Sequence, residues 1–440
     1  MHGLGSGKTL TSIAAADALG MPADVVLPAA LRANYQKELA KHAPIDTPET
    51  HIQSLENVAR RQLPLHNPLL IVDEAHRSRN PSMTQRALRN NEAKKRLLLT
   101  GSLFYNQPAD AAGPVNIAAG GSVLPSDPDE FRRMFVSEKN YEPGFFGKLI
   151  GKKPTTSFEV NPANKKYLQG VLNKYVDYHP SSKTDFPSRT DETIDVPMGS
   201  RQKEIYDTIL GRAPAWVQAR VVSGLPPSKS EASQLNRFLQ GGRQVSNSTA
   251  PYHMDRPPEQ PKIDRAVSEL RKLLETNPQA KALVYSNYLD AGVTPYKHLL
   301  DEHKIPYGEF TGMQSRKTRD QMVKDYNDNK LRALLLSRAG GEGLDLKGTR
   351  LIQLLEPHWN EEGPKQVVGR GIRYRSHVDL PEDQRNVHVQ HFLTANPRRG
   401  IRQRLHLTDP ERSVDQYLQG LAAQKEELNQ KFRDLLKERP

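Results

Sequence analysis

The chain has 440 residues, no cysteine, and 63 basic against 51 acidic residues, which gives a formal net charge of +12. The absence of cysteine excludes disulfides, thiolate metal sites and cysteine nucleophiles, and no apolar run approaches the roughly 18 to 20 residues of a membrane-spanning helix. A chain of this length is expected to form two or three domains, and its charge favours a polyanionic partner. We expect an intracellular, cytoplasmic protein without an export signal.

The first motif is the glycine-rich stretch HGLGSGKT, which a helical pattern follows. Such a loop surrounds a polyphosphate with backbone N–H groups, while its lysine reaches the β and γ phosphates and its threonine hydroxyl binds Mg²⁺. The residues predicted to bind nucleotide here are Gly3, Gly5, Ser6, Gly7, Lys8 and Thr9. Because such a loop normally follows a buried strand and only one residue precedes His2, we expect the N-terminal strand to be missing.

Residues 23–28 read as a strand and 31–39 as a helix, and two carboxylates then follow the apolar stretch 68–72. A continuous apolar run of this length is typical of a parallel strand buried on both faces. Ligands of parallel sheets bind at the carboxyl ends of strands, so Asp73 and Glu74 are expected beside a nucleotide. Asp73 would hold Mg²⁺, and Glu74 would polarise the water that attacks the γ phosphate.

Residues 96–99 read as a further buried strand that ends in Thr-Gly-Ser, and a helix is expected to open near 106–108. Strands that alternate with helices predict a doubly wound parallel sheet. Between about 120 and 261 the pattern weakens, apart from a helical segment at 201–210. The lysine-bearing stretch 144–156 reads as an exposed loop, either solvated or touching nucleic acid, and the proline-rich stretch 251–261 reads as a linker.

The second half repeats the alternation, with strands expected at 282–286, 331–336, 351–355 and 387–392 and a helix at 289–303. Between the last two strands, Gln366, Gly369, Arg370 and Arg373 fall at helical spacing and are expected to share one face. Paired arginines on one face suit phosphate recognition and transition-state charge. A last helix is expected over 413–437, either as a brace on the body or as a short coiled-coil dimer.

The order of these motifs resembles that of the superfamily 2 helicases. The sequences GSGKT, DEAH, TGS, SRAGGEG and QVVGRGIR follow one another along the chain. Within that superfamily the chain is similar to the Swi/Snf-type DNA translocases. The stretch 372–387 further resembles the viral branch that includes poxvirus nucleoside triphosphatase I and phage relatives.

The resemblance implies an α/β fold of two RecA-like doubly wound lobes with ATP and Mg²⁺ between them. We expect the first lobe at 1–120, an irregular and helical insertion with a linker at 121–260, the second lobe at 261–400 and a brace helix at 401–440. The residues that the resemblance assigns to catalysis are Lys8, Glu74, Gln366, Arg370 and Arg373, with Gly343 added to the nucleotide site. Those that it assigns to coupling are His76, Thr100, Gly101 and Ser102.

The same resemblance implies a DNA-dependent ATPase that moves along nucleic acid, with duplex DNA as the expected partner and a monomer as the expected state. Contacts are expected to go to phosphates from loops that follow strands. The candidates are Pro28, Arg32, Ser286, Asn287, Thr311, Gly312, Ser337, Arg338 and Gly340. Two alternatives stay open, an RNA-directed helicase and a truncated nucleic-acid-binding remnant without ATPase activity.

Overall fold

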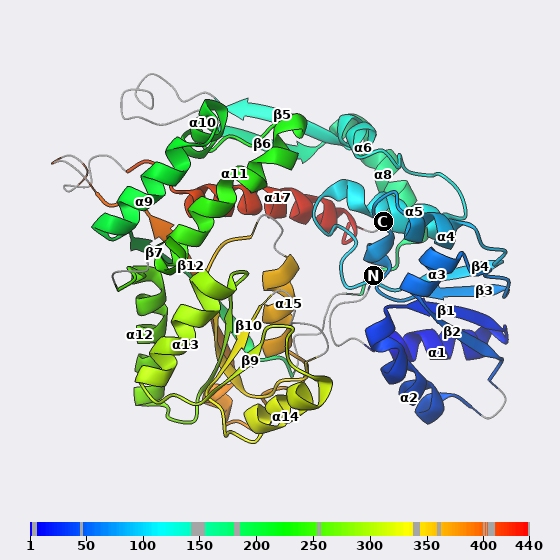
Figure 1. The fold of residues 1–440 in the computed structure, drawn as a ribbon. Coiled ribbons are helices and arrows are strands. Elements are labelled where there is room, and N and C mark those ends of the chain that lie inside the picture. Colours follow the sequence, from blue (N-terminus) through cyan, green and yellow to red (C-terminus); the bar gives the residue numbers. More distant parts are fainter. Residues whose placement is uncertain are drawn as a thin grey trace. The chain divides into compact units, whose positions relative to one another are not determined.

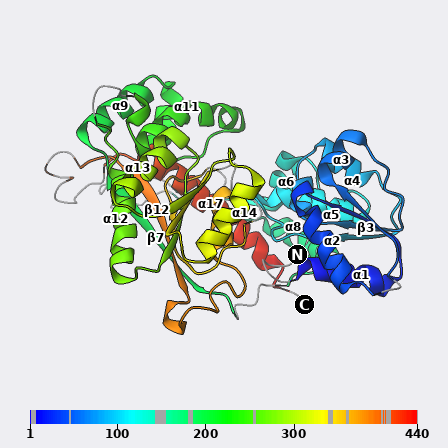
Figure 2. The ribbon, with the colours of Figure 1, turned by 60° about the horizontal axis from the view of Figure 1, so that its bottom comes forward.

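The computed structural model describes residues 1, 7–44, 47–141, 155–179, 185–252, 257–337, 344–358, 362–398, 401, 403 and 410–438. The chain divides into two compact units, whose elements are shown in Figures 1 and 2. Unit 1 comprises Met1–Glu142, Pro154–Lys183 and Gln424–Pro440, and unit 2 comprises Pro143–Lys153 and Thr184–Ala423. Among the described residues, no helix combines the length and apolar character needed to cross a membrane.

Unit 1 is built on a four-stranded, all-parallel sheet with the order β2-β1-β3-β4. The strands are β1 (Ala23–Leu27), β2 (Thr50–Ser54), β3 (Leu69–Val72) and β4 (Lys95–Leu98). Every residue of β3 is buried, as expected for an apolar strand covered on both faces. The strands predicted at 23–28, 68–72 and 96–99 are therefore confirmed to within a residue or two.

Helices cover both faces of this sheet. Helices α1 (Lys8–Leu19) and α2 (Arg32–His42) lie on one face, and α3 (Leu55–Arg61), α4 (Met83–Arg89) and α5 (Ala112–Ala119) lie on the other. Successive residues of a strand point to opposite faces of the sheet. Accordingly, Val25 packs with Ile13 of α1, whereas Val26 packs with Val58 of α3. The sheet is therefore doubly wound, as predicted.

The rest of unit 1 forms a second core beside this sheet. It contains α6 (Pro128–Phe135), α8 (Pro162–Tyr175), the antiparallel pair β5 (Val136–Tyr141) and β6 (Thr155–Val160), and the end of α17 (Val414–Leu435). The rings of Phe104 and Phe432 meet edge to face at 5.8 Å in this core. Within the described part of unit 1, short 3-10 turns connect some of the elements, namely η1 (Ala29–Leu31), η2 (Ala75–Ser78) and η3 (Pro108–Ala111).

Unit 2 contains a six-stranded parallel sheet with the order β7-β12-β11-β8-β10-β9. Its strands are β7 (Ser188–Pro197), β8 (Lys281–Tyr285), β9 (Tyr307–Phe310), β10 (Ala333–Leu336), β11 (Thr349–Leu354) and β12 (Asn386–Ala395). The four strands predicted in this half are confirmed. Strand β7 lies at the edge, is mostly exposed and polar, and had not been predicted.

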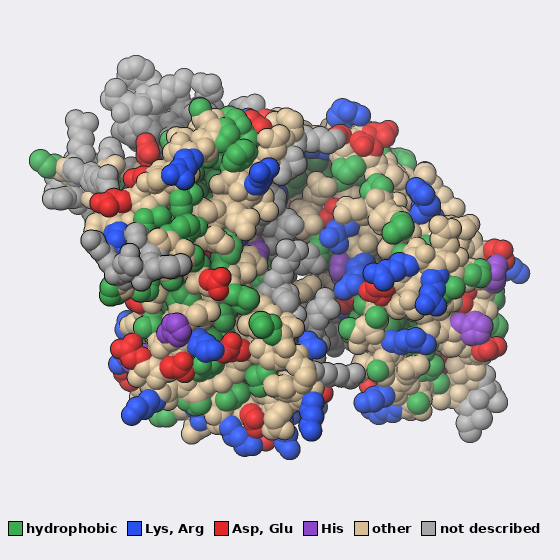
Figure 3. Space-filling view, in the orientation of Figure 1, with side chains coloured by type: hydrophobic (Ala, Val, Ile, Leu, Met, Phe, Trp, Pro, Cys, Tyr) green, Lys and Arg blue, Asp and Glu red, His purple; other side chains and the backbone are tan. Residues whose placement is uncertain are grey.

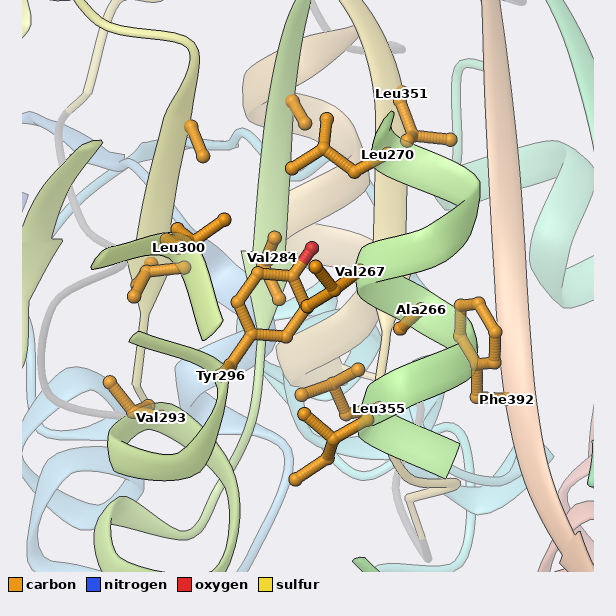
Figure 4. Packing of buried hydrophobic residues seen from close by; sticks show 14 of the residues in the cluster. Ala266, Val267, Leu270, Val284, Val293, Tyr296, Leu300, Leu351, Leu355 and Phe392 are labelled. Carbon is orange, nitrogen blue, oxygen red and sulfur yellow. The ribbon is translucent and has the colours of Figure 1, made fainter. Parts of the chain in front are cut away.

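This second sheet is also covered on both faces, which confirms the predicted fold class. Helices α12 (Pro261–Thr276) and α13 (Thr294–Glu302) cover one face, while α14 (Arg316–Asn327) and α15 (Glu362–Gly371) cover the other. Figure 4 shows the rings of Tyr296 and Phe392 among the aliphatic side chains of the core that α12 and α13 form with the sheet. The helix predicted at 289–303 begins with a π turn, η5 (Leu289–Val293).

A helical group completes unit 2. It consists of α9 (Ser200–Gly211), α10 (Ala215–Ser223), α11 (Lys229–Asn247) and the first part of α17 (Val414–Leu435). The short turns η4 (Ala250–Tyr252) and η6 (Glu382–Gln384) lie elsewhere in unit 2. In α17, Val414 and Leu418 are buried in unit 2, whereas Phe432 and Leu435 are buried in unit 1. The apolar side of this helix is therefore covered by the chain itself.

Candidate active site

The turn after β3 holds Asp73 and Glu74 in a fixed arrangement. The Asp73 N–H donates to the Val26 carbonyl at 2.9 Å, and the Asp73 carboxylate accepts the Glu74 N–H at 2.8 Å. Glu74 adopts a left-handed backbone conformation with φ 51° and ψ 45°. Such a conformation costs a non-glycine residue on the order of 1–3 kcal/mol and is enriched at functional sites.

The environment drives the pKa values of the two carboxylates in opposite directions. Burial raises the pKa of Asp73, and the charge of Glu74 raises it further. Burial would also raise the pKa of Glu74, but the hydrogen bond and charge of His76, with the charges of Lys8 and Arg77, outweigh burial and lower it. The lowered pKa of Glu74 keeps this carboxylate ionised at neutral pH.

His76 connects Glu74 to the loop after β4. Its Nδ1 lies 3.2 Å from Glu74 Oε2 and 3.3 Å from Thr100 Oγ1. The Thr100 hydroxyl donates to the Ser102 carbonyl at 2.8 Å, with Gly101 between them in the loop. The residues assigned to coupling are therefore brought together with the carboxylates at one edge of the sheet.

Tyr105 supports His76, and sequence reasoning missed it. Its ring stacks on the imidazole with 4.6 Å between centroids and 10° between planes. The Arg79 guanidinium also lies over the Tyr105 ring, 4.4 Å from its centroid. No spacing pattern marks such a tyrosine, because its partner is close in space rather than in sequence.

The start of α1 lies near the same carboxylates. Gly7 caps the helix with φ 75°, a left-handed conformation that glycine adopts without strain. Lys8 follows at the first helical position, and its charge lowers the pKa of both Asp73 and Glu74. Gly3, Gly5 and Ser6 lie outside the described residues.

Tyr35 of α2 is a further residue that the sequence did not single out. Its hydroxyl lies 2.9 Å from Ser12 Oγ of α1. Burial raises the pKa of Tyr35, and the Asp73 charge adds to this effect although the Ser12 bond opposes it. The tyrosine therefore stays neutral and links α2 to the helix that follows the glycine-rich loop.

The predicted arginine face of unit 2 differs in one respect from the structure. Gln366 and Arg370 lie in α15, but the helix ends at Gly371, so Arg373 stands in the turn that follows. The expectation that Arg373 shares a helical face with the others is therefore wrong. The chain turns here because Ser376 bonds to the backbone of Arg373. The Arg373 guanidinium forms an ion pair of 3.0 Å with Asp345.

The candidates for nucleic-acid contact in unit 2 follow neighbouring strands. Ser286, Thr311 and Ser337 each come directly after the end of β8, β9 or β10, and these strands are parallel and in register. Their carboxyl ends therefore meet at one edge of the sheet. Arg338, Gly340 and Gly343 lie outside the described residues.

The exposure of these candidates varies. Arg32 and Gly312 are exposed, Asn287 and Thr311 are half-buried, and Pro28, Ser286 and Ser337 are buried. The Ser286 hydroxyl donates to the buried Glu356 carboxylate at 3.1 Å. A contact between this side chain and nucleic acid would require that bond to break.

Glu356, which follows β11, accepts hydrogen bonds from several elements of unit 2. The sequence did not predict this role. Besides the bond from Ser286, Glu356 accepts hydrogen bonds from the Asn247 amide of α11 and from the Asn287 N–H. Burial raises the pKa of Glu356, while these bonds and the charges of Lys262 and Arg243 oppose the rise. A single acidic residue after an apolar strand carries no spacing signal that would reveal this role.

Two family models match the chain in succession. Residues 33–250 match the SNF2-related domain, and residues 265–375 match the helicase conserved C-terminal domain. The first range includes Asp73, Glu74 and Thr100, and the second includes Gln366, Arg370 and Arg373. The matches therefore contain most of the residues that the structure arranges at the ends of the two sheets.

Several of the curated proteins that resemble this chain come from viruses. Protein L538 of Acanthamoeba polyphaga mimivirus, which carries the name of an ATP-dependent RNA helicase, is 28% identical over 99% of this chain and 92% of its own length. The termination factor NPH-I homolog of African swine fever virus is 25% identical over 99% of this chain and 74% of its length. Nucleoside triphosphatase I of Heliothis armigera entomopoxvirus is 30% identical over 37% of this chain and 24% of its length.

Among solved structures, the SWI2/SNF2 ATPase core of Sulfolobus solfataricus in complex with duplex DNA is 16% identical. The match covers 90% of this chain and 82% of that chain, with a TM-score of 0.36.

Proposed function

The chain belongs to the SNF2-related group of superfamily 2 helicases and is a helicase-type ATPase, and we propose that it couples ATP hydrolysis to movement along duplex DNA. The observation that carries the proposal is the gathering of Glu74, His76 and Thr100 at one edge of the unit 1 sheet, with Lys8 close enough to act on the carboxylates. This arrangement links a candidate water-activating group directly to a loop that can respond to nucleic acid.

In the proposed reaction, Lys8 binds the β and γ phosphates and Glu74 orients the attacking water. A lowered pKa keeps Glu74 ionised, so that its oxygens can accept hydrogen bonds from that water. Arg370 and Arg373 of unit 2 would balance the charge that develops on the γ phosphate, and Gln366 would assist them.

Mg²⁺ is the metal that this chemistry requires, and Thr9 with Asp73 would hold it. Carboxylate and hydroxyl oxygens are the ligands that Mg²⁺ prefers. Within the described residues, Asp73 uses Oδ1 to accept the Glu74 N–H, which leaves Oδ2 for the ion or for a water bound to it. The ion would neutralise phosphate charge when ATP is bound.

Binding to nucleic acid would rest mainly on phosphate contacts. In the view of Figure 3, Lys and Arg side chains are spread over the visible face with Asp and Glu among them, rather than gathered in one patch. Contacts of this kind give binding that weakens steeply with salt and depends little on base sequence. We further propose that the protein acts as a monomer inside the cell, in the cytoplasm of a virus-infected or phage-infected host.

The decisive experiment measures phosphate release from ATP with no nucleic acid, with duplex DNA and with single-stranded RNA. Strong stimulation by duplex DNA that is lost in Lys8→Ala, but kept in the exposed control Lys94→Ala, would support the proposal. Greater stimulation by RNA would replace it with the RNA helicase alternative, which the name of the mimivirus relative favours. DNA binding without hydrolysis would favour a remnant that only binds nucleic acid.

A further inference from the structure

The turn that carries Arg373 is hydrogen-bonded to Thr349, the first residue of β11, and to Gly348 just before it. The Arg373 N–H donates to Ser376 Oγ at 3.2 Å, and the Ser376 N–H donates to the Arg373 carbonyl at 3.2 Å. On the other side, the Gly348 N–H donates to the Ser376 carbonyl at 2.8 Å, and His377 Nε2 lies 2.6 Å from the Thr349 carbonyl oxygen. Ser376 and His377 therefore join the backbone of Arg373 to that of residues 348 and 349.

The polarity of these bonds follows from the chemistry of the groups. A carbonyl oxygen only accepts, so His377 Nε2 carries a hydrogen and donates to Thr349. In the neutral imidazole Nδ1 is then an acceptor, and it lies 2.8 Å from Ser376 Oγ. The Ser376 hydroxyl has one hydrogen, which it can donate either to this nitrogen or to the Arg373 carbonyl oxygen 2.9 Å away, and its oxygen accepts the Arg373 N–H. The bonds form one chain that runs from Arg373 through Ser376 and His377 to Thr349.

The surroundings of His377 keep it neutral. Burial lowers the pKa of His377, the bond to Thr349 opposes this, and the positive charges of Arg350 and Lys281 lower the pKa further. The Tyr326 hydroxyl meets Thr349 Oγ1 at 2.8 Å and is itself fully buried. His377 and Thr349 are also buried, so water does not compete for these bonds.

A second contact holds the same turn from the chain segment before β7. The Arg375 N–H donates to the Asp185 carbonyl at 2.8 Å, and Arg375 has a left-handed φ of 56°. The Phe186 ring packs against Tyr374 with 5.9 Å between centroids. A left-handed non-glycine residue persists only where its surroundings determine the backbone path, as they do here.

We propose that Ser376 and His377 are positioning residues for the ATPase reaction, which hold the backbone of Arg373 so that its guanidinium can meet the γ phosphate. The inference rests on the proposed function, because it requires Arg373 to act on ATP. The Arg373 side chain is only partly buried and pairs with the largely exposed Asp345, so its backbone is the part that the structure fixes most firmly. A displacement of about 1 Å in a catalytic group can cost up to about a hundredfold in rate.

The test is a double-mutant cycle on phosphate release at saturating ATP and duplex DNA. Ser376→Ala is expected to lower kcat by roughly tenfold with little change in the KM for ATP, while Ser376→Thr, which keeps the hydroxyl, retains most of the rate. In an Arg373→Ala background, Ser376→Ala should cause no further loss, because its effect passes through Arg373. The exposed serine variant Ser188→Ala serves as the control.

The outcomes separate this inference from the proposed function. If Arg373→Ala keeps full activity, the role assigned to Arg373 fails and the inference fails with it. If Arg373→Ala is inactive but Ser376→Ala is not impaired, the inference alone is overturned. It is also overturned if Ser376→Ala lowers the rate equally in both backgrounds. A second variant, His377→Gln, keeps a donor toward Thr349 and should be less impaired than His377→Leu, with thermal unfolding used to compare their folding.

Discussion

The Nδ1 atom of His76 lies 3.2 Å from Oε2 of Glu74, and the same nitrogen lies 3.3 Å from the Thr100 hydroxyl. Ionised Glu74 can only accept hydrogen bonds, so Nδ1 carries the hydrogen when this pair forms. The hydrogen on Nδ1 is therefore donated either to the Glu74 carboxylate or to the Thr100 hydroxyl in the loop after β4. A shift of that loop would change the hydrogen bonding, and hence the acidity, of Glu74.

The first prediction concerns this histidine. His76→Ala should raise the pKa of Glu74, because the half-buried carboxylate loses the contact that lowers its pKa most. The acid side of the pH profile of ATP hydrolysis should therefore move to higher pH, and stimulation by DNA should fall. The exposed His66 in the same unit provides a matched control, His66→Ala, that should leave the profile unchanged. An unshifted acid limb in His76→Ala would contradict the role given to the pair.

The second prediction concerns hydrolysis itself. Glu74→Gln removes the charge but keeps the size of the side chain, and it should lower phosphate release by roughly 10²-fold or more. Binding of ATP should persist, since Lys8 remains in place. Measurement of nucleotide binding by fluorescence beside phosphate release separates the two steps. DNA-stimulated hydrolysis that survives this change would exclude Glu74 as the water-activating group.

The third prediction concerns stability in unit 2. Lys262 and Asp415 form an ion pair of 2.6 Å, with side chains that are 1% and 0% exposed, and Asp415 also accepts the Thr394 N–H. Asp415→Ala should lower the free energy of unfolding by roughly 3–5 kcal/mol, because it leaves a buried ammonium without its partner. Asp325→Ala, at the exposed pair with Lys330, should cost much less, because solvent screens that pair. Denaturant unfolding of both variants checks the contrast, and equal costs would refute it.

The fourth prediction concerns the pH dependence of stability. Burial lowers the pKa of Lys281 to about 8, with nearby Arg332 adding to the effect. Between pH 8 and the usual lysine pKa of about 10.4, the unfolded chain binds more protons than the folded chain, so this lysine makes the free energy of unfolding rise with pH. The difference between wild type and Lys281→Met, measured at several pH values in this window, isolates the contribution. A difference that stays constant with pH would show that the pKa is not lowered.

The sequence predicted the parts of the fold in which local pattern and burial agree. Strand β3 was recognisable because all four of its residues are apolar and buried, and the carboxylates that follow it could be placed from the rule for parallel sheets. Strand β7 was missed because it lies at an edge, where exposed positions are filled with charged and hydroxyl side chains. A polar strand of this kind has no apolar run to mark it.

The candidate site also contains residues that the sequence pattern marks and residues that it does not mark. The motif residues at the ends of β3 and β4 could be named in advance because their spacing is distinctive. Tyr105, Glu356 and His377 could not, since each acts through partners that only the folded chain brings near. The end of α15 was misjudged because helical spacing continues through Arg373, while the serine that turns the chain follows three residues later.

The division of α17 between two cores has a consequence for biosynthesis. Phe432, Leu435 and Leu436 complete a core of unit 1 that also contains Leu103 and Phe131. A ribosome that has released the first 180 residues has therefore not yet supplied every side chain of that core, and almost the whole of unit 2 must be made before the remainder emerges. Closure of this core is a late event, and the nascent chain exposes apolar surface that chaperones can bind until then.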